Sequence, residues 1–163
     1  MVRTVKIMLM LTVGIWGIAG FMSNMLDFAA GHEQVRYVLS MEGAMDTPGI
    51  SWRRVSLPIA ADMGFAVIYM SKLLTSLLCF YCALQMFKSR DADAATFERA
   101  KRWGILGCGI GVVMLFLGFI VTAETFFEYW RVPTLGVVTH DFAFSYIMFL
   151  IGFLLVLQYP EKH

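Results

Sequence analysis

The chain has 163 residues, of which 59% are hydrophobic and only 15% are charged, with a formal net charge of +1 at pH 7. Soluble domains carry about 25% charged residues, so the composition excludes an ordinary soluble protein, and the near-neutral charge gives no basis for a nucleic-acid partner. Long apolar runs occupy most of the length. We therefore expect one membrane domain that covers residues 1–163.

The first apolar run predicts a membrane helix at residues 5–28. Arg3 and Lys6 precede it, as in a signal peptide, but the apolar run continues beyond the small residues at 17–19, so we interpret it as an uncleaved helix. The polar segment at 29–57 follows as an outer loop. Its apolar spacing from Glu33 to Met41 favours a short surface helix, and the residues at 46–49 favour a turn, so we expect this loop to be ordered.

The second helix is predicted at residues 58–88 and contains Lys72 near its middle. A charge at bilayer depth costs at least about 2.5–3.5 kcal/mol, and both ends of the run are too distant for the side chain to reach water. Ser76 and Cys79 follow Lys72 at offsets of 4 and 7 along the same helix face. Lys72 is therefore expected to face protein, as an interhelical hydrogen-bond or ion-pair donor, a binder of an anionic lipid, quinone or cofactor, or part of a proton or ion path.

The third and fourth helices are predicted at residues 97–127 and 140–159. A stripe of four glycines lies along one face of the third helix at offsets of 0, 3, 7 and 14, and it consists of Gly104, Gly107, Gly111 and Gly118. Such stripes let helices approach closely in lipid. The predicted fold class is thus all-α, an integral membrane four-helix bundle with an ordered outer, periplasmic loop between helices 1 and 2.

Metal and redox motifs are weak in this sequence. Cys79 and Cys82 form a C-x-x-C, but they lie inside a membrane helix, where small packing residues explain them better than redox or zinc chemistry. The three histidines are in loops or the tail, which disfavours a haem in the membrane core. No cofactor is predicted, although soft and imidazole donors near the outer surface form a weak candidate copper site, namely His32, His140, Met22 and Met25.

Polar residues concentrate at the outer ends of the helices. They form either a solvated rim of ion pairs or a polar pocket or docking surface. The residues are Asn24, Asp27, Arg36, Arg53, Asp62, Glu124, His140 and Asp141.

The distribution of positive charge predicts the orientation in the membrane. Eight Lys and Arg residues lie on the side of the termini and four on the opposite side, with Lys72 in between. The positive-inside rule then predicts that both termini are cytoplasmic.

Several segments carry a family resemblance, the most specific being the Val-Arg-Tyr-Val-Leu-Ser-Met run at 35–41, together with residues 24–28 and Trp52-Arg53. With these segments the chain resembles an uncharacterised bacterial family of predicted small integral membrane proteins, a domain of unknown function. The resemblance implies four transmembrane helices in the bacterial inner membrane and no known activity. An acidic residue is expected in relatives where this chain has Lys72, which argues against a shared catalytic role for that position.

No catalytic residues are predicted, and an enzyme is the less favoured class. Our leading hypothesis is an accessory, non-catalytic subunit of a larger inner-membrane complex, respiratory or transport, which docks through the small-residue helix faces and the outer loops. Its partners would be membrane lipids and other integral membrane subunits or further copies of the chain, with a bound lipid or quinone left open. The alternatives are a small oligomeric transporter or channel with Lys72 in its path, and an outer-face copper-binding membrane protein.

Overall fold

The computed structural model describes residues 2–43, 49–132 and 135–161, and within these it contains helices and no strand. Four helices are long and apolar enough to cross a membrane. They are α1 (Val2–Leu26), α3 (Pro58–Lys88), α4 (Ala94–Met114) continued by the π-helix η2 (Leu115–Phe126), and α5 (Leu135–Gln158). The predicted all-α, four-span membrane fold is confirmed.

The loop between the first two spans is largely helical. Asp27 leaves the helical conformation at φ −123° and ψ 55°, so the first span ends at Leu26 instead of residue 28, and α2 begins at Phe28 and continues to Ser40. The surface helix predicted at 33–41 is therefore longer toward its N-terminus. It ends where Met41 adopts a left-handed conformation with φ 56°, and the predicted turn at 46–49 falls mostly outside the described residues.

The remaining helix boundaries follow local capping signals. Pro58 opens α3, where its missing N–H costs nothing. Asp93 caps α4 because its carboxylate accepts a 2.7 Å hydrogen bond from the Thr96 backbone N–H, so this span begins at Ala94 instead of residue 97. The last helix begins at Leu135, upstream of the predicted residue 140, and ends at Gln158.

The second half of the third span is a π-helix, which the sequence analysis did not predict. In η2 the hydroxyls of Thr122 and Thr125 donate to carbonyls five residues earlier, those of Leu117 and Ile120, at 2.7 and 2.8 Å. A π-helix of 12 residues is long, because such segments occur mostly as single-turn bulges. The wider turn changes which residues of this span face the bundle after Met114.

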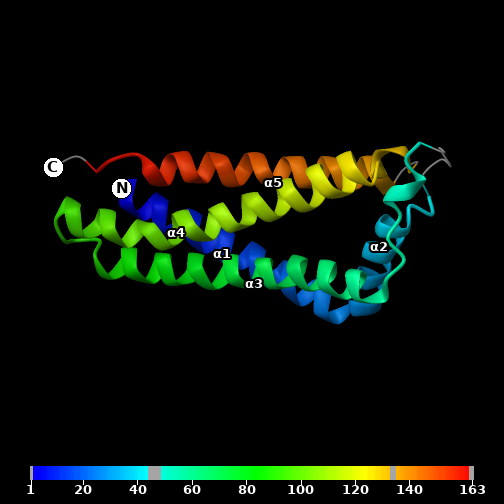
Figure 1. Ribbon diagram of the computed structural model, residues 1–163. Helices are drawn as coiled ribbons and strands as arrows, with labels where there is room; N and C mark the ends of the chain where they lie inside the picture. Colours follow the sequence, from blue (N-terminus) through cyan, green and yellow to red (C-terminus); the bar gives the residue numbers. More distant parts are fainter. Residues whose placement is uncertain (1, 44–48, 133–134, 162–163) are drawn as a thin grey trace.

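The helices pack in the spatial order α1, α3, α4 and α5. Figure 1 shows an elongated bundle with both ends of the chain at one end, here called the inner end, and α2 at the other, here called the outer end. The two short 3-10 helices are η1 (Ser51–Arg53) and η3 (Tyr129–Arg131). The ring of Tyr37 in α2 packs against that of Tyr129 in η3, and Val55, just after η1, donates its N–H to the Leu39 carbonyl of α2. Toward the outer end α3 and α4 diverge, and α2 lies across the gap between them (Figure 1).

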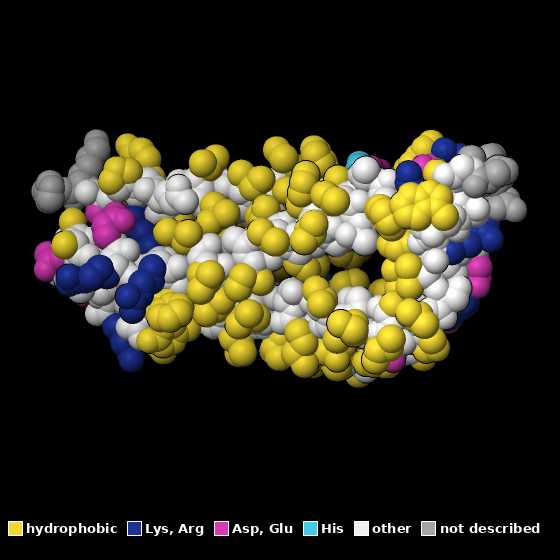
Figure 2. All heavy atoms as spheres, viewed as in Figure 1, with side chains coloured by type: hydrophobic (Ala, Val, Ile, Leu, Met, Phe, Trp, Pro, Cys, Tyr) yellow, Lys and Arg dark blue, Asp and Glu magenta, His cyan; other side chains and the backbone are white. Residues whose placement is uncertain are grey.

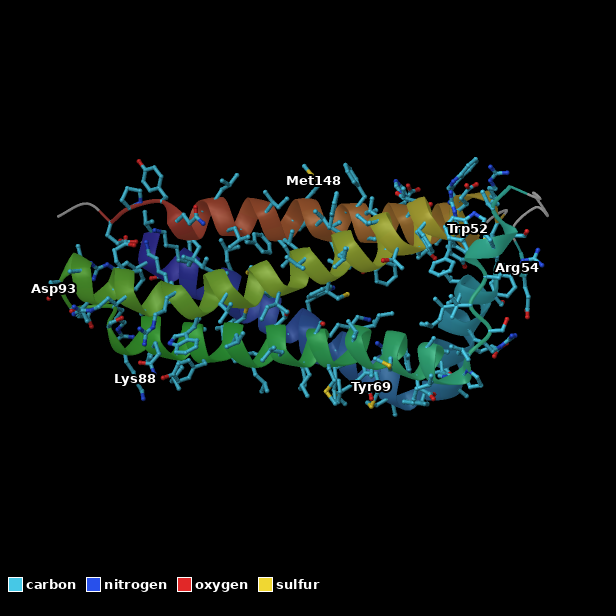
Figure 3. All side chains as sticks on the ribbon, viewed as in Figure 1. Trp52, Arg54, Tyr69, Lys88, Asp93 and Met148 are labelled. Atoms are coloured by element: carbon cyan, nitrogen blue, oxygen red, sulfur yellow. The ribbon has the colours of Figure 1, made fainter. Side chains whose placement is uncertain are left out.

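Side-chain packing differs along the bundle. The buried core draws residues from α1, α3, α4 and α5, and much of it lies toward the inner end, for example Met10, Cys82 and Leu157. Figure 2 shows charged side chains gathered at the two ends and a largely apolar middle. In Figure 3, Lys88 and Asp93 mark the inner end and Trp52 and Arg54 the outer end. Charged ends and an apolar central band are typical of a protein whose central band contacts lipid tails.

Candidate functional site

The Lys72 face of α3 packs against α1. Ser76 and Cys79 on this face are fully buried, and the Ser76 hydroxyl donates a 2.7 Å hydrogen bond to the Gly14 carbonyl of α1. A Cβ atom added to Gly17 would lie 2.8 Å from the Lys72 carbonyl oxygen, so the two backbones approach closely. Glycine is required at this contact because any side chain would separate the helices.

The glycine stripe of α4 is used inside the chain. A Cβ atom on Gly107 would lie 2.9 Å from Cys79 Sγ, and one on Gly111 would lie 3.0 Å from Leu150 of α5. Gly104 is equally crowded, by Met10 and Cys82, whereas Gly118 has open space. The expectation that this stripe docks a partner is thus corrected for the first three glycines, because α1, α3 and α5 already occupy that face.

Where α3 and α4 diverge, they border a cavity of about 930 Å³ that is partly open to the surface of the molecule. We name it the Lys72 cavity. Its walls come from α1, α2, α3, α4, η2 and the outer end of α5, and they are mainly aliphatic, including Ile68, Leu106 and Val113. Figure 2 shows a hollow between the two halves of the molecule toward the outer end. The cavity therefore lies between membrane-spanning segments and extends to the outer end of the bundle.

Lys72 lies in the wall of this cavity and is partly buried. Its ammonium makes no hydrogen bond or ion pair with any residue that the structure describes. The side chain extends across Gly20 of α1, where an added Cβ atom would lie 3.2 Å from Lys72 Cδ and 3.7 Å from Nζ. The absence of a side chain at Gly20 leaves room for this extended conformation.

Asn24 is a second polar residue in the same wall, one helical turn beyond Gly20. Its amide nitrogen is buried and has no hydrogen-bond partner among the described residues. Asn24 was predicted to belong to the outer polar cluster. The structure instead brings it to the same cavity as Lys72, because the face of α1 that carries Gly20 and Asn24 borders the gap between the helix pairs.

The other members of the predicted outer cluster are divided among separate contacts. His32 contacts Asp62 at 2.9 Å between Nε2 and Oδ1, and Arg36 pairs with Glu33 and Glu42 at 2.6 and 2.8 Å. These hydrogen bonds from Arg36 lower the pKa of the Glu33 carboxyl. Asp27 and Asp141 are exposed. The predicted cluster is therefore several local ion pairs, as in a solvated rim, and not one site.

Arg53 connects the outer loops. It donates to the Phe126 carbonyl at 3.0 Å and pairs with Glu128 at 3.4 Å, and Glu128 also contacts Arg131. Glu128 has a left-handed backbone with φ 51°. Gln34 of α2 donates to the hydroxyl of Tyr129. These contacts fix η1 against the end of η2 and α2 against η3, next to the outer end of the Lys72 cavity.

A smaller polar pocket of about 620 Å³ lies beside η2 and α5, and Glu124 and His140 line it. Glu124 is buried with one carboxylate oxygen unpartnered among the described residues, and its other oxygen lies 4.0 Å from His140 Nδ1. Of the weak copper candidates, Met22 and Met25 are exposed on α1. In the described part of the chain, no group of three His, Cys, Asp or Glu side chains is arranged to hold a metal ion.

A buried ion cluster at the inner end was missed by the sequence analysis. Lys6 and Lys101 are almost fully buried, and both pair with Glu161 Oε1, at 2.7 and 3.4 Å. Burial by itself would raise the pKa of Glu161, but the hydrogen bonds from Lys6 and Arg3 and the positive charges of Lys6 and Lys101 together outweigh it and lower that pKa below its ordinary value. Only the fold brings residues 6, 101 and 161 together, so no local sequence signal could have revealed the cluster.

The C-x-x-C cysteines are interior packing residues. Cys79, Cys82 and Cys108 are free thiols with no exposed surface. Cys82 Sγ donates to the Ala100 carbonyl of α4 at 3.4 Å. Each cysteine fills a contact between α3 and α4.

Four membrane-spanning helices with an aliphatic cavity between them define a small polytopic integral membrane protein. The family described as "Predicted small integral membrane protein (DUF2165)" matches residues 2–160, and the chain belongs to this family. Its members are described only by their membrane character. No match to the chain was found among curated proteins or among solved structures.

Proposed function

We propose that this protein is a non-catalytic binding protein of the bacterial inner membrane, which holds a lipid-soluble molecule in the Lys72 cavity. The supporting observation is the cavity itself, whose volume of about 930 Å³ lies within the roughly 300–1,000 Å³ range of ligand sites. Apolar walls with a few polar groups are typical of such sites. The distribution of Lys and Arg favours cytoplasmic termini and a cavity in the periplasmic half of the bilayer.

The proposal is tested by filling the cavity. Gly109 and Gly118 line it and have open space where a Cβ would be, so Gly109→Phe and Gly118→Phe place a ring in the cavity without displacing neighbouring helices. Gly152 on α5 also has open space but does not line the cavity, and Gly152→Phe is the matched control. Each variant is purified in mild detergent, and its bound small molecules are extracted and quantified by mass spectrometry.

The wild-type protein and Gly152→Phe are expected to retain a stoichiometric bound molecule, and the two cavity variants are expected to lose it. Equal ligand content in all four proteins would overturn the proposal. A normal gel-filtration profile for each variant ensures that lost ligand does not reflect unfolding.

We further propose that the protein acts as an accessory subunit of a larger respiratory or transport assembly. The outer loops support this role, because the contacts of Arg53 and Gln34 hold them in a fixed surface from which Trp52 and Trp130 project. Aromatic side chains at this level also anchor proteins to the membrane interface. Extraction of the native protein in mild detergent, followed by measurement of its apparent mass, tests the subunit role. Migration only at the mass of a single chain would contradict that role.

The second candidate function is a small oligomeric transporter or channel with Lys72 in its path. One observation favours it: the same cavity borders Lys72 in the middle of α3 and Gln34, Tyr129 and Thr139 at the outer end. In proteoliposomes Lys72→Met should then abolish flux and leave the assembly intact. If the protein is instead a subunit that docks through the Lys72 face, Lys72→Met should weaken its association with the partner.

A further inference from the structure

Two hydrogen-bond donors face the Lys72 cavity without an acceptor. The Asn24 amide nitrogen is buried without a hydrogen-bond partner among the described residues, and the Lys72 ammonium likewise has no partner among them; the two side chains come from different helices. Gly20 lies beside Lys72, and Asn24 is four residues further along α1, about 6 Å along the helix axis. A buried donor that lacks an acceptor, as at Asn24, is costly. Lys72 is only partly buried, but an acceptor group placed between the two would accept hydrogen bonds from both.

Lys72 cannot reach water along its own helix. It lies 14 residues after Pro58 and 16 before Lys88, which correspond to about 21 and 24 Å of helix. A lysine side chain is far shorter than either distance, so snorkelling to an interface is not available. The side chain is instead held across Gly20 at the edge of the cavity.

The acceptor that best suits this position is an anion. In surroundings of low dielectric an ammonium group is stabilised by a paired negative charge far more than by a neutral dipole. No described carboxylate lies within ion-pair distance of Lys72. The remaining cavity wall is aliphatic, formed largely by Ile110, Val113 and Leu117 of the third span, and it suits a hydrocarbon chain.

We propose that the Lys72 cavity binds an acidic single-chain amphiphile, whose anionic headgroup accepts hydrogen bonds from Lys72 and Asn24 while its hydrocarbon chain lies along α4 and η2. A single chain is specified because about 930 Å³ lies near the upper end of sites for drug-sized ligands. The shared chemistry is an oxyanion on a hydrocarbon chain, either a fatty-acid carboxylate or a phosphate monoester. The inference rests on the proposed binding function and names its ligand class.

Equilibrium binding to the delipidated, detergent-purified protein tests the inference with three probes of equal chain length: palmitate, palmityl phosphate and palmityl alcohol. At least one acidic probe is expected to bind wild type about tenfold or more tightly than the alcohol, as one charge-assisted hydrogen bond provides. Whichever acidic probe binds more tightly identifies the headgroup. Equal affinity for acids and alcohol would overturn the inference.

Variants locate the headgroup. Lys72→Met should remove the preference for acids, Lys72→Arg should restore most of it, and Asn24→Leu should reduce it several-fold. Lys88→Met is the matched control, because Lys88 lies on the same helix but is exposed at its inner end, and its preference should equal that of wild type. Unchanged acid preference in Lys72→Met would contradict the inference, and thermal unfolding of each variant verifies that it is folded.

The two proposals fail in different ways. If all three probes bind equally and Gly109→Phe abolishes binding of each, the cavity is a binding site but its ligand is not selected by charge. If none of the three probes binds, and no molecule is extracted from the native protein, the binding function itself is wrong.

Discussion

The ammonium of Lys6 in the first turns of α1 donates a 2.7 Å hydrogen bond to Glu161 Oε1, beyond the end of α5. The same carboxylate oxygen lies 3.4 Å from the Lys101 ammonium of α4. Glu161 thereby pairs with two buried ammonium groups and ties the C-terminal segment to the first and third spans, while Lys101 also pairs with Glu98 at 2.6 Å. Arg3 adds a 3.3 Å contact to the second carboxylate oxygen.

Glu161→Gln should therefore destabilise the protein strongly. Breaking a buried ion pair costs about 3–5 kcal/mol, and we expect a loss near 3 kcal/mol because Tyr159 and Glu98 still accept hydrogen bonds from the lysines. The free energy of unfolding is measured for both proteins in detergent with increasing denaturant concentration. The control is Glu33→Gln, which removes an exposed ion pair and should change stability little; equal effects of both would contradict the assignment.

The same carboxylate predicts a pH dependence. Glu161 has a lowered pKa in the folded state, so its contribution is fully present well above the unfolded-state pKa of about 4.3. It is lost as the pH falls through that value and then through the lower folded-state pKa. Melting temperatures measured from pH 7 downward should fall more steeply for wild type than for Glu161→Gln. Parallel curves would show that other groups control the acid response.

The close packing of α4 on α3 predicts a sharp difference between two glycines. Gly107→Ala introduces a Cβ atom 2.9 Å from Cys79 Sγ and 3.2 Å from the Thr75 carbonyl, and overpacking of this kind costs about 1–3 kcal/mol. Gly152→Ala meets no atom within 4 Å and should be neutral or stabilising by up to about 1 kcal/mol. Thermal unfolding of both variants in one detergent provides the comparison. A tolerated Gly107→Ala would mean that the helices separate easily there.

The buried cysteines predict resistance to thiol reagents. Cys79, Cys82 and Cys108 have no exposed surface, so a maleimide should leave the folded protein unmodified in detergent and react with all three after denaturation. Intact-protein mass spectrometry counts the adducts. Fast labelling of the folded protein would contradict the burial of these thiols and would indicate a reactive role for the C-x-x-C pair.

Membrane orientation is tested with single added cysteines, which the unreactive native thiols make practicable. Leu57 at the outer end and Asp91 at the inner end are both exposed. With cytoplasmic termini, a membrane-impermeant maleimide added to intact cells should label Leu57→Cys and not Asp91→Cys until the membrane is opened. The reverse pattern would invert the proposed orientation.

The spans were predictable from sequence because each depends on local composition. A helix of about 20 apolar residues satisfies its own backbone in lipid wherever it packs, so α3 begins and ends at the predicted residues. The predicted helix boundaries were wrong at caps and irregular turns, where a single residue determines where a helix ends. Asp27 ended α1 early, and the π-helical hydrogen bonding of η2 has no periodic signature strong enough to read from the chain.

Sequence spacing also identified the face of α3 that carries Lys72, Ser76 and Cys79, because helical geometry alone groups them. It could not identify what covers that face. The tertiary structure decided that α1 packs against Lys72 and Ser76 through Gly14 and Gly17 and that α4 packs against Cys79 through Gly107. It also decided that three of the four stripe glycines are used within the bundle and that Asn24 lines the same cavity as Lys72. These are distances between helices, which depend on how all four pack.

The sequence by itself thus determined that this is a four-span membrane protein with one charge at mid-membrane depth, because hydropathy and helical period are properties of consecutive residues. Only the tertiary structure decided that α3 and α4 diverge around a cavity, that Lys72 and Asn24 line it, and that Glu161 pairs with Lys6 and Lys101 at the opposite end. Such arrangements join residues up to 155 positions apart. Packing between helices, rather than any local pattern, brings them into contact.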